Sequence, residues 1–359
     1  MVSQEEISRL KVVMYPAVGV KDENRYLDVL VNALRDAGVE VNGWRKHLSF
    51  QTGDVFHVHW PEIIPGIQSR RYNGLRGKWI AWQFFRTIQR VKKRGGRVVW
   101  TAHDLQPHWD DLRNDLFFKR FMAHFVEQVD IVLSLTEAGI DNIKQKIPAL
   151  EKATFFVAHH PHYRSVLGSG SYDMAERARL GIKPEQKVFA FIGSLRANKR
   201  PELVASSFRD LPSHDNFLLV AGAASDDMAQ TMHSLTAGLF NVRLDLRRIP
   251  EEEIIRLYGA ADVLVFPGTD YFNSGTIYTA LSLNLPVIAA RSPTNEELQK
   301  LVGTEWIYLY DGDFSVQVLE EGARSLAKRG VGTVCNMSRF APKVCAKEHI
   351  TAYRYGMKS

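Results

Sequence analysis

Two short polar segments in the second half of the chain carry residues suited to binding a diphosphate. In the first, FIGSLRANKRPEL (191–203), a predicted strand leads through Gly193 into a turn that holds Arg196 and Lys199, just before a helix that starts near Pro201. Basic side chains and helix N-termini both attract phosphate groups. Two cations three residues apart at this place therefore suit a diphosphate, although a solvated basic loop explains the segment equally well by itself.

The second segment, FPGTDYFNSGTIYTALSLNLPVIA (266–289), contains a small polar turn directly before an apolar helix. Asn or Ser can cap that helix, and glycine lets a ligand approach the backbone amides closely. An ordinary capped helix is an equally good explanation of this segment alone. Two phosphate-suited loops in successive strand–helix units, however, are better explained by one ligand. The candidate contacts to that ligand are Gly193, Arg196, Lys199, Arg248, Asn273, Ser274, Gly275, Thr276 and Thr279.

The elements that position these loops are predicted to be two α/β domains. Short β-branched runs alternate with amphipathic segments, which is typical of β–α–β units and parallel sheets. In the first half we expect strands at 10–15, 39–44, 55–59, 97–103, 131–134 and 154–158, and helices at 25–38, 79–93 and 111–129. In the second half we expect strands at 188–192, 217–221, 242–245, 263–267 and 286–290, and helices from 201, at 250–258 and at 273–283. The boundary falls within 159–185, which predicts two Rossmann-like domains (1–163 and 164–338) facing a central cleft, and a final helix (339–359) that packs back on the first domain.

Bulk composition narrows the class of protein. The 359 residues carry a net charge of +6, which favours anionic partners such as phosphates or acidic lipids. The basic residues follow no nucleic-acid-binding motif, so nucleic acid is not expected as a partner. Cys335 and Cys345 are the two cysteines, too few for a disulfide framework, and a reducing cytoplasm is the expected compartment. No apolar run reaches the roughly 18 residues of a spanning helix, and the N-terminus does not read as a secretory signal.

Several sequence strings together resemble a known enzyme family. GSLRANKRPEL (193–203), IPEEEIIRLYGAADVLVFPG (249–268) and LSLNLPVIAA (281–290) look like the donor half of GT-B glycosyltransferases. More narrowly, the chain resembles the xanthan-type GDP-mannose:glycolipid 4-β-mannosyltransferases of glycosyltransferase family 94, over about residues 10–355. The strings that carry this second resemblance are VFHVHWPE (55–62), TAHDLQPH (101–108), HHPHYRS (159–165), FNSGTIYTALSLNLPV (272–287) and EWIYLYDGDF (305–314).

The resemblance implies a GT-B fold with an N-terminal acceptor-binding domain and a C-terminal nucleotide-sugar-binding domain. It further implies transfer of a sugar, best taken as mannose from GDP-mannose in β-linkage, to a polyprenyl-diphosphate-linked oligosaccharide in exopolysaccharide synthesis. The nucleotide sugar is then a co-substrate, and no cofactor is expected. UDP-glucose or another nucleotide sugar as donor stays open, as does a non-catalytic scaffold subunit of the same fold.

One departure from the wider group bears on stereochemistry. Many retaining GT-B enzymes carry two glutamates eight residues apart, at the positions of Tyr271 and Thr279 here. Because both carboxylates are missing, we expect an inverting enzyme. No carboxylate pair suited to a metal lies beside the diphosphate loops, so a metal-independent reaction is favoured.

Inversion by single displacement needs a base for the acceptor hydroxyl. Glu62 is ranked first and Asp104 second, because both follow predicted strands of the first domain. Asp104 stands where the xanthan-type pattern has asparagine, which counts against it, and His103 is expected to contact the donor sugar or phosphate instead. A surface acid or a turn cap is an equally good explanation of each carboxylate. Further candidates for the acceptor side of the cleft are His57, His59, Trp60, His108, His160 and Tyr163.

Two other features of the first half invite functional readings. Seven of the twelve histidines lie in the strings VFHVHWPE, TAHDLQPH and HHPHYRS, which a metallohydrolase could use, but the phosphate-suited loops would then be unexplained. The segment 71–96 predicts a helix with Ala81, Phe84 and Ile88 on its core face, and with Trp79, Trp82 and many cations elsewhere. A sheet-covering helix explains it equally well, but the lipid-linked acceptor implied by the resemblance favours peripheral contact with the inner face of the cell membrane.

Overall fold

The computed structural model describes residues 10–16, 25–45, 50–51, 53–64, 75–105, 115–168, 170, 172–269, 273–330 and 332–356. The chain divides into two compact units. Unit 1 comprises Met1–Pro161 and Arg339–Ser359, and unit 2 comprises His162–Ser338. The chain thus passes from unit 1 to unit 2 at residues 161–162 and returns at residues 338–339.

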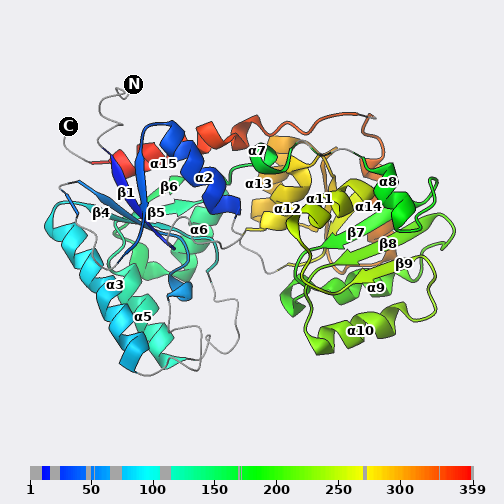
Figure 1. Ribbon diagram of the computed structural model, residues 1–359, viewed down its shortest axis with the longest axis horizontal. Helices are drawn as coiled ribbons and strands as arrows, with labels where there is room; N and C mark the ends of the chain where they lie inside the picture. Colours follow the sequence, from blue (N-terminus) through cyan, green and yellow to red (C-terminus); the bar gives the residue numbers. More distant parts are fainter. Residues whose placement is uncertain are drawn as a thin grey trace. The chain divides into compact units, whose positions relative to one another are not determined.

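Unit 1 is built on a six-stranded parallel sheet with the order β2-β1-β3-β4-β5-β6 (Figure 1). Its strands are β1 (Lys11–Tyr15), β2 (Glu40–Gly43), β3 (Val55–Val58), β4 (Arg97–Thr101), β5 (Ile131–Ser134) and β6 (Thr154–Val157). Every residue of β3 and of β5 is buried, as expected for central strands that helices cover on both faces. The carboxyl ends of β3 and β4, neighbours in the sheet, are followed by the sequence-predicted catalytic candidates.

The helices of unit 1 are α2 (Arg25–Asp36), α3 (Leu75–Lys93), α5 (Leu116–Val126), α6 (Glu137–Lys146) and α15 (Pro342–Arg354). The last of these packs on α2 and β5, so the end of the chain is part of unit 1. Figure 1 shows α3 and α5 next to each other, and ring contacts confirm it: Phe85 of α3 lies 5.1 Å from Phe121 of α5.

Unit 2 holds a second six-stranded parallel sheet, in the order β12-β11-β10-β7-β8-β9. Its strands are β7 (Lys187–Ile192), β8 (Asn216–Ala221), β9 (Val242–Asp245), β10 (Val263–Phe266), β11 (Val287–Ala290) and β12 (Ile307–Tyr310). Its helices are α7 (Arg164–Leu167), α8 (Met174–Arg179), α9 (Pro201–Phe208), α10 (Asp226–Thr236), α11 (Glu251–Ala260), α12 (Gly275–Ser282), α13 (Pro293–Val302) and α14 (Val316–Leu326).

The strand order of unit 2 reverses between β7 and β10. From β7 the chain builds outward through β8 to β9, and it then crosses to β10 and builds the other way to β12. Ligands of open α/β sheets bind beyond the carboxyl ends of the strands at such a reversal, which here are the ends of β7 and β10. Both sequence-predicted diphosphate loops follow these two strands.

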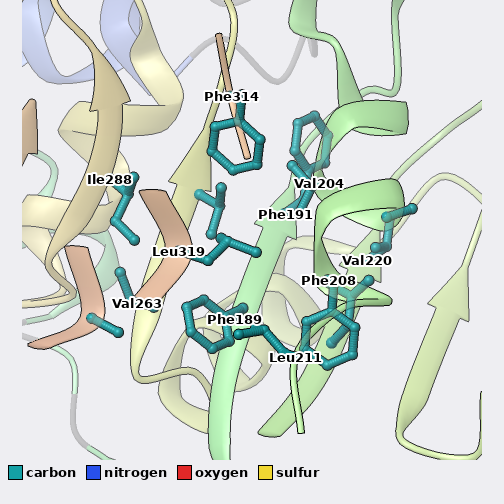
Figure 2. Packing of buried hydrophobic residues seen from close by; sticks show 14 of the residues in the cluster. Phe189, Phe191, Val204, Phe208, Leu211, Val220, Val263, Ile288, Phe314 and Leu319 are labelled. Atoms are coloured by element: carbon teal, nitrogen blue, oxygen red, sulfur yellow. The ribbon is translucent and has the colours of Figure 1, made fainter. Parts of the chain in front are cut away.

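The core of unit 2 explains why this sheet forms where the sequence predicts it. Figure 2 shows Phe189 and Phe191 of β7 among Val204 and Phe208 of α9 and Leu319 of α14. All five are at most 2% exposed. Complete burial of each such side chain contributes roughly 1.5–3 kcal/mol. The alternating phenylalanines of β7 therefore anchor the strand whose end carries Gly193 against α9 and α14.

The structure confirms the predicted pair of parallel α/β sheets. The predicted strands are all present, with ends that agree within two residues. The prediction omits β12, a short aromatic run, and it omits the helices α6, α7, α10, α13 and α14. No helix of the described residues is both long enough and apolar enough to cross a membrane.

Candidate functional site

The two predicted diphosphate loops of unit 2 meet at Gly193. Gly193 follows β7 with a φ of +138°, a conformation that favours glycine. A Cβ placed on it would lie 3.4 Å from Lys199 Nζ and 3.5 Å from Thr276 Oγ1. The glycine thus leaves a small open space between the ammonium group of one loop and the hydroxyl group of the other. A side chain at this position would fill that space.

The start of α12 gives this space an electropositive wall. Ser274 is the N-cap residue but its side chain makes no capping hydrogen bond, and the first turn holds no acidic residue. Gly275, the first helical residue, is exposed. The first N–H groups of a helix lack intrahelical acceptors and carry the positive end of its dipole. With Lys199 on the opposite side, the arrangement can stabilise an anion.

The remaining donor-side candidates differ in their exposure to solvent and in their distance along the sheet from β7. Arg196 precedes the 3₁₀ turn η4 (Ala197–Lys199) and is exposed, whereas Lys199 is half-buried. Arg248 is exposed and follows β9, two strands away from β7. Thr279 is buried, and its hydroxyl donates to the Gly275 carbonyl at 2.8 Å. The structure therefore brings Gly193, Lys199 and Thr276 together, while the Thr279 hydroxyl is used within its own helix. Tyr271 lies outside the described residues.

Sequence reasoning missed two residues that shape this site. Arg200, directly after Lys199, has a left-handed backbone (φ 53°) and forms the N-cap of α9. Burial raises the pKa of the Tyr310 phenol to about 12, and the positive charge of Arg200 acts in the opposite direction. The Tyr310 hydroxyl donates to the Pro267 carbonyl at the end of β10. Neither residue belongs to a motif that could have identified it from the sequence. Arg200 is a left-handed residue before a proline, and Tyr310 lies in the unpredicted strand β12.

Tyr163 lies in unit 2, although the sequence-based boundary put it in the first domain. Its backbone N–H donates to Ser282 Oγ of α12 at 2.9 Å. A Cβ placed on Gly275 would lie 3.7 Å from the Tyr163 hydroxyl. Tyr163 is therefore a neighbour of the diphosphate loop, which its position in the sequence alone did not indicate.

In unit 1, a group of rings gathers at the carboxyl ends of β3 and β4. His103 stacks on Trp60 with a centroid distance of 4.1 Å and meets the edge of Tyr26 at 4.7 Å. His59 Nδ1 and His103 Nε2 are 3.1 Å apart and share a hydrogen bond. His160, just before the chain first leaves unit 1, also belongs to this group. Its ring centroid lies 5.0 Å from that of Tyr26. Four of the predicted acceptor-side and catalytic residues thus form one packed group around Tyr26.

Burial lowers the pKa of two histidines of this group. Burial lowers the pKa of His59 well below its ordinary value, and the neighbouring His349 lowers it further. Burial likewise lowers the pKa of His160 to about 4. His57 is fully buried, with hydrogen bonds of 2.8 Å to the Thr101 and Tyr353 hydroxyls, so it lies inside the unit and not at its surface. His108 falls outside the described residues.

In unit 1, one carboxylate contacts residues next to both places where the chain crosses between the units. Glu348 of α15 accepts hydrogen bonds from the backbone N–H and the Nδ1 of His159, which lies just before the first crossing. Arg339, just after the second crossing, lies 3.2 Å from the same carboxylate. Burial raises the pKa of Glu348, but the hydrogen bonds from His159 and the charge of Arg339 outweigh that effect and lower it.

The two candidate bases line one cavity of unit 1. Glu62 lies in the 3₁₀ turn η1 (Pro61–Ile63) after β3, and Asp104 follows β4. Both border a cavity of about 390 Å³ whose wall includes Trp100. Volumes of this order are ordinary for small-molecule sites. Two carboxylates from neighbouring strand ends thus share access to one space, an arrangement suited to binding and deprotonating a hydroxyl group. Among the described residues, no three His, Cys, Asp or Glu side chains are grouped so that they could hold a metal ion.

Comparison with known proteins agrees with this geometry. Residues 173–326, most of unit 2, match the family model of glycosyl transferases group 1. A curated relative, GDP-mannose:glycolipid 4-beta-D-mannosyltransferase of Xanthomonas campestris pv. campestris, is 27% identical over 297 residues, which are 82% of this chain and 78% of the relative. The chain is a glycosyltransferase.

Solved structures resemble the fold of this glycosyltransferase over 96% of the chain. The catalytic domain of starch synthase IV from Arabidopsis thaliana, bound to ADP and acarbose, superposes with a TM-score of 0.64 at 11% identity, covering 96% of this chain and 98% of that one. Sucrose-phosphate synthase from Thermosynechococcus elongatus gives a TM-score of 0.61 at 15% identity, with coverage of 96% and 98%. Together with the two parallel sheets, these likenesses show that the fold is GT-B.

Proposed function

We propose that this glycosyltransferase transfers mannose from GDP-mannose, with inversion at the anomeric carbon, to a polyprenyl-diphosphate-linked oligosaccharide in exopolysaccharide synthesis. The observation that carries the proposal is the similarity to the Xanthomonas mannosyltransferase. Its 297 aligned residues are more than either unit contains, so the similarity extends over the donor-side and the acceptor-side unit. The name of that relative specifies both a GDP-mannose donor and a glycolipid acceptor.

The donor side supports this proposal because it can stabilise negative charge on the leaving diphosphate. As the bond between the anomeric carbon and the diphosphate oxygen breaks, its electron pair leaves with GDP, and negative charge grows on that oxygen. Lys199 and the first N–H groups of α12 are the groups that stabilise this charge, with the diphosphate in the space beside Gly193. These cationic and amide groups supply the stabilisation from the chain itself, in line with a metal-independent reaction.

The acceptor side must supply a base. The acceptor oxygen attacks the anomeric carbon from the face opposite GDP, and its proton passes to a carboxylate of unit 1, Glu62 or Asp104. Inversion follows because a single displacement reverses the configuration once. The absence of the glutamate pair of many retaining GT-B enzymes supports this course, and at the second of those positions the buried Thr279 hydroxyl is bonded to its own helix.

Incubation of the purified protein with a panel of donors tests the proposal. The panel contains GDP-mannose, GDP-glucose, UDP-glucose and UDP-galactose, with a lipid-linked oligosaccharide extract as acceptor. We expect release of GDP from GDP-mannose, dependent on the extract, at least about tenfold above the nucleotide release from any other donor. The labelled product should be sensitive to β-mannosidase and resistant to α-mannosidase. Preferred use of a UDP-sugar, or an α-linked product, would refute the assigned donor or stereochemistry, and absence of all turnover would favour a scaffold subunit.

Peripheral membrane contact through α3 and α5 is part of the proposal, because the acceptor is lipid-linked. Trp79 and Trp82 of α3 are 46% and 51% exposed, and Leu116 at the start of α5 is 61% exposed. The guanidinium of Arg86 lies over the Trp82 ring at 4.8 Å. Neither helix contains an acidic residue. Exposed tryptophan among cations suits a surface of anionic lipid.

The contacts of the cations on and after α3 decide which of them are suitable for testing this proposal. At the end of α3, Lys92 is paired with Asp130 at 3.0 Å, and the side chain of Arg94 donates to the Phe50 carbonyl. These two residues stabilise unit 1 and are poor choices for testing lipid contact. Lys78 and Arg86 are exposed on the same stripe as Trp82 and are the better choice.

The variant Lys78→Gln/Arg86→Gln is expected to bind about 30-fold more weakly to vesicles of phosphatidylcholine and phosphatidylglycerol. Each basic residue near an anionic surface contributes roughly 1 kcal/mol, and two such losses give that factor. Vesicle co-sedimentation measures the partition coefficient. The matched control Lys300→Gln/Arg324→Gln removes two exposed cations of unit 2 and should bind like the parent protein. Equal loss in both double variants would show a general effect of net charge and would refute a surface on α3.

A further inference from the structure

Within unit 2, the carboxyl end of α12 is hydrogen-bonded to residues next to both places where the chain crosses between the units. Arg164, shortly after the first crossing, donates from Nε to the Ser282 carbonyl at 3.1 Å and from Nη2 to Asn284 Oδ1 at 2.8 Å. The same Nη2 group donates to the carbonyl of Cys335, shortly before the second crossing, at 2.8 Å. One guanidinium group thus joins three segments that are far apart in the sequence.

Asn284 completes this group of hydrogen bonds. It follows the C-cap residue of α12 and has a left-handed backbone with a φ of 60°. Its Oδ1 accepts from the Arg164 guanidinium and also from the backbone N–H of Cys335 at 3.0 Å. Cys335 is therefore attached to the end of α12 directly through its N–H group and indirectly through its carbonyl group. We call Arg164, Ser282, Asn284 and Cys335 the Arg164 cluster.

An arginine is well suited to this end of a helix. The last carbonyl groups of a helix lack intrahelical donors and carry the negative end of its dipole. Arg164 supplies both a hydrogen bond and a positive charge there, and its planar group has further N–H donors that reach a second chain segment. Lysine would keep the charge without this fixed fork of donors. Arg164 therefore fixes α12 relative to the segment that contains Cys335.

The opposite end of α12 is the end that faces the diphosphate in the proposed function. The N-cap residue Ser274 makes no side-chain capping bond there. Tyr163, the residue before Arg164, lies next to both ends of the helix. Its N–H donates to Ser282 Oγ at 2.9 Å, and a Cβ on Gly275 would lie 3.7 Å from its hydroxyl. A shift of α12 would therefore alter the contacts of both residues that follow the first crossing.

We infer that Arg164 is a positioning residue for the donor diphosphate, and that occupation of the donor site is coupled to the segment before the second crossing. Bound diphosphate holds the first N–H groups of α12, and the Arg164 cluster passes this restraint to Cys335 at the other end of the helix. Coupling between two sites is reciprocal, so loss of the cluster weakens nucleotide binding to the degree that nucleotide stabilises the cluster. The inference rests on the proposed function for the position of the diphosphate.

The rate of alkylation of the Cys335 thiol reports on the cluster. Cys335 and Cys345 are the two cysteines of the chain, and both have an exposed fraction of 0%. Iodoacetamide reaches such a thiol only when its segment opens locally. In the parent protein we expect saturating GDP to slow alkylation of Cys335 about tenfold, a factor typical of coupling between two sites. Cys345 of α15 in unit 1 is the internal control, and its rate should not depend on GDP. Mass spectrometry of the two peptides gives both rates.

Arg164→Met removes the guanidinium group and keeps an extended side chain. We expect it to weaken GDP binding about tenfold in calorimetric titration, and we expect GDP no longer to slow alkylation of Cys335. Arg164→Lys keeps the charge at the helix end and should recover part of both effects. Asn284→Gly keeps the left-handed backbone and removes Oδ1, so it provides the same test if Arg164→Met does not fold.

Arg209→Met is the matched control, because Arg209 also holds a helix end of unit 2. It donates to the carbonyls of Leu235 and Ala237 at the end of α10, at 3.0 and 2.9 Å, and lies far along the chain from both crossings. Its replacement should leave the GDP affinity and the response of Cys335 at their parent values. Losses equal to those of Arg164→Met would show a general effect of helix stability and would overturn the inference.

The remaining outcomes separate this inference from the proposed function. GDP binding that leaves alkylation of Cys335 unchanged in the parent protein would overturn the coupling alone, as would unchanged GDP affinity in Arg164→Met. If UDP bound in place of GDP, the assigned donor would be wrong, and the same measurements with UDP would decide the coupling. If neither nucleotide bound, the donor site would be refuted and the coupling with it.

Discussion

Replacing Lys199 by alanine is expected to lower the rate of sugar transfer about 100- to 1,000-fold. Its ammonium group is half-buried, and the open space beside Gly193 separates it from Thr276. A group that stabilises charge developing in the transition state contributes roughly 2.7–4 kcal/mol to the rate, and this range corresponds to the expected factor. The measurement is kcat with saturating donor, together with the Kd for the nucleoside diphosphate.

Two further variants show whether the loss of rate is specific to Lys199. Arg196→Ala should cost only about tenfold, because its side chain is exposed and its charge is screened by water. Lys300→Ala, at an exposed lysine of α13, should leave the rate at the parent value. If Lys199→Ala and Lys300→Ala had the same small effect with folding intact, the diphosphate site would have to lie elsewhere in unit 2.

In unit 2, the local sequence pattern predicts individual strands and helices but not the order of the strands in the sheet. The run KVFAFI predicts a buried strand, and the following glycine, cations and proline predict a turn and a helix start, all of which β7, η4 and α9 contain. The pattern does not reveal that β10 pairs with β7 and places the second loop beside the first. Strand order is set by the packing of distant segments, so the closeness of Lys199 and Thr276 to Gly193 is known only from the structure.

The acceptor side was predicted less completely, for a similar reason. Strand ends indicate Glu62, His103 and Asp104 correctly as neighbours at one sheet edge, because parallel strands present their carboxyl ends together. Whether a histidine lies at the surface depends on what covers it, and α15, more than 280 residues after β3, covers His57 through Tyr353. That Trp100 lines the same cavity as Glu62 and Asp104 is likewise visible only in the structure.

Glu62→Gln is expected to reduce sugar transfer about 100- to 10,000-fold, with the donor Kd unchanged. Glutamine keeps the shape of the side chain and its hydrogen-bonding capacity but cannot accept the proton of the acceptor hydroxyl, and loss of a general base costs a factor of that size. Donor affinity should persist because the diphosphate loops belong to unit 2. The measurements are transfer rate, donor Kd and acceptor KM for the same preparation.

Asp104→Asn decides between the two carboxylates, because both border the cavity and only one needs to accept the proton. If Glu62 is the base, Asp104→Asn should mainly raise the acceptor KM, since asparagine still forms hydrogen bonds to sugar hydroxyls, and kcat should fall less than about tenfold. Glu127→Gln, an exposed acid at the end of α5, is the matched control and should behave like the parent protein. A large loss of kcat in Asp104→Asn with near-normal turnover by Glu62→Gln would reverse the assignment. Near-normal turnover in both would exclude this edge of unit 1 as the source of the base.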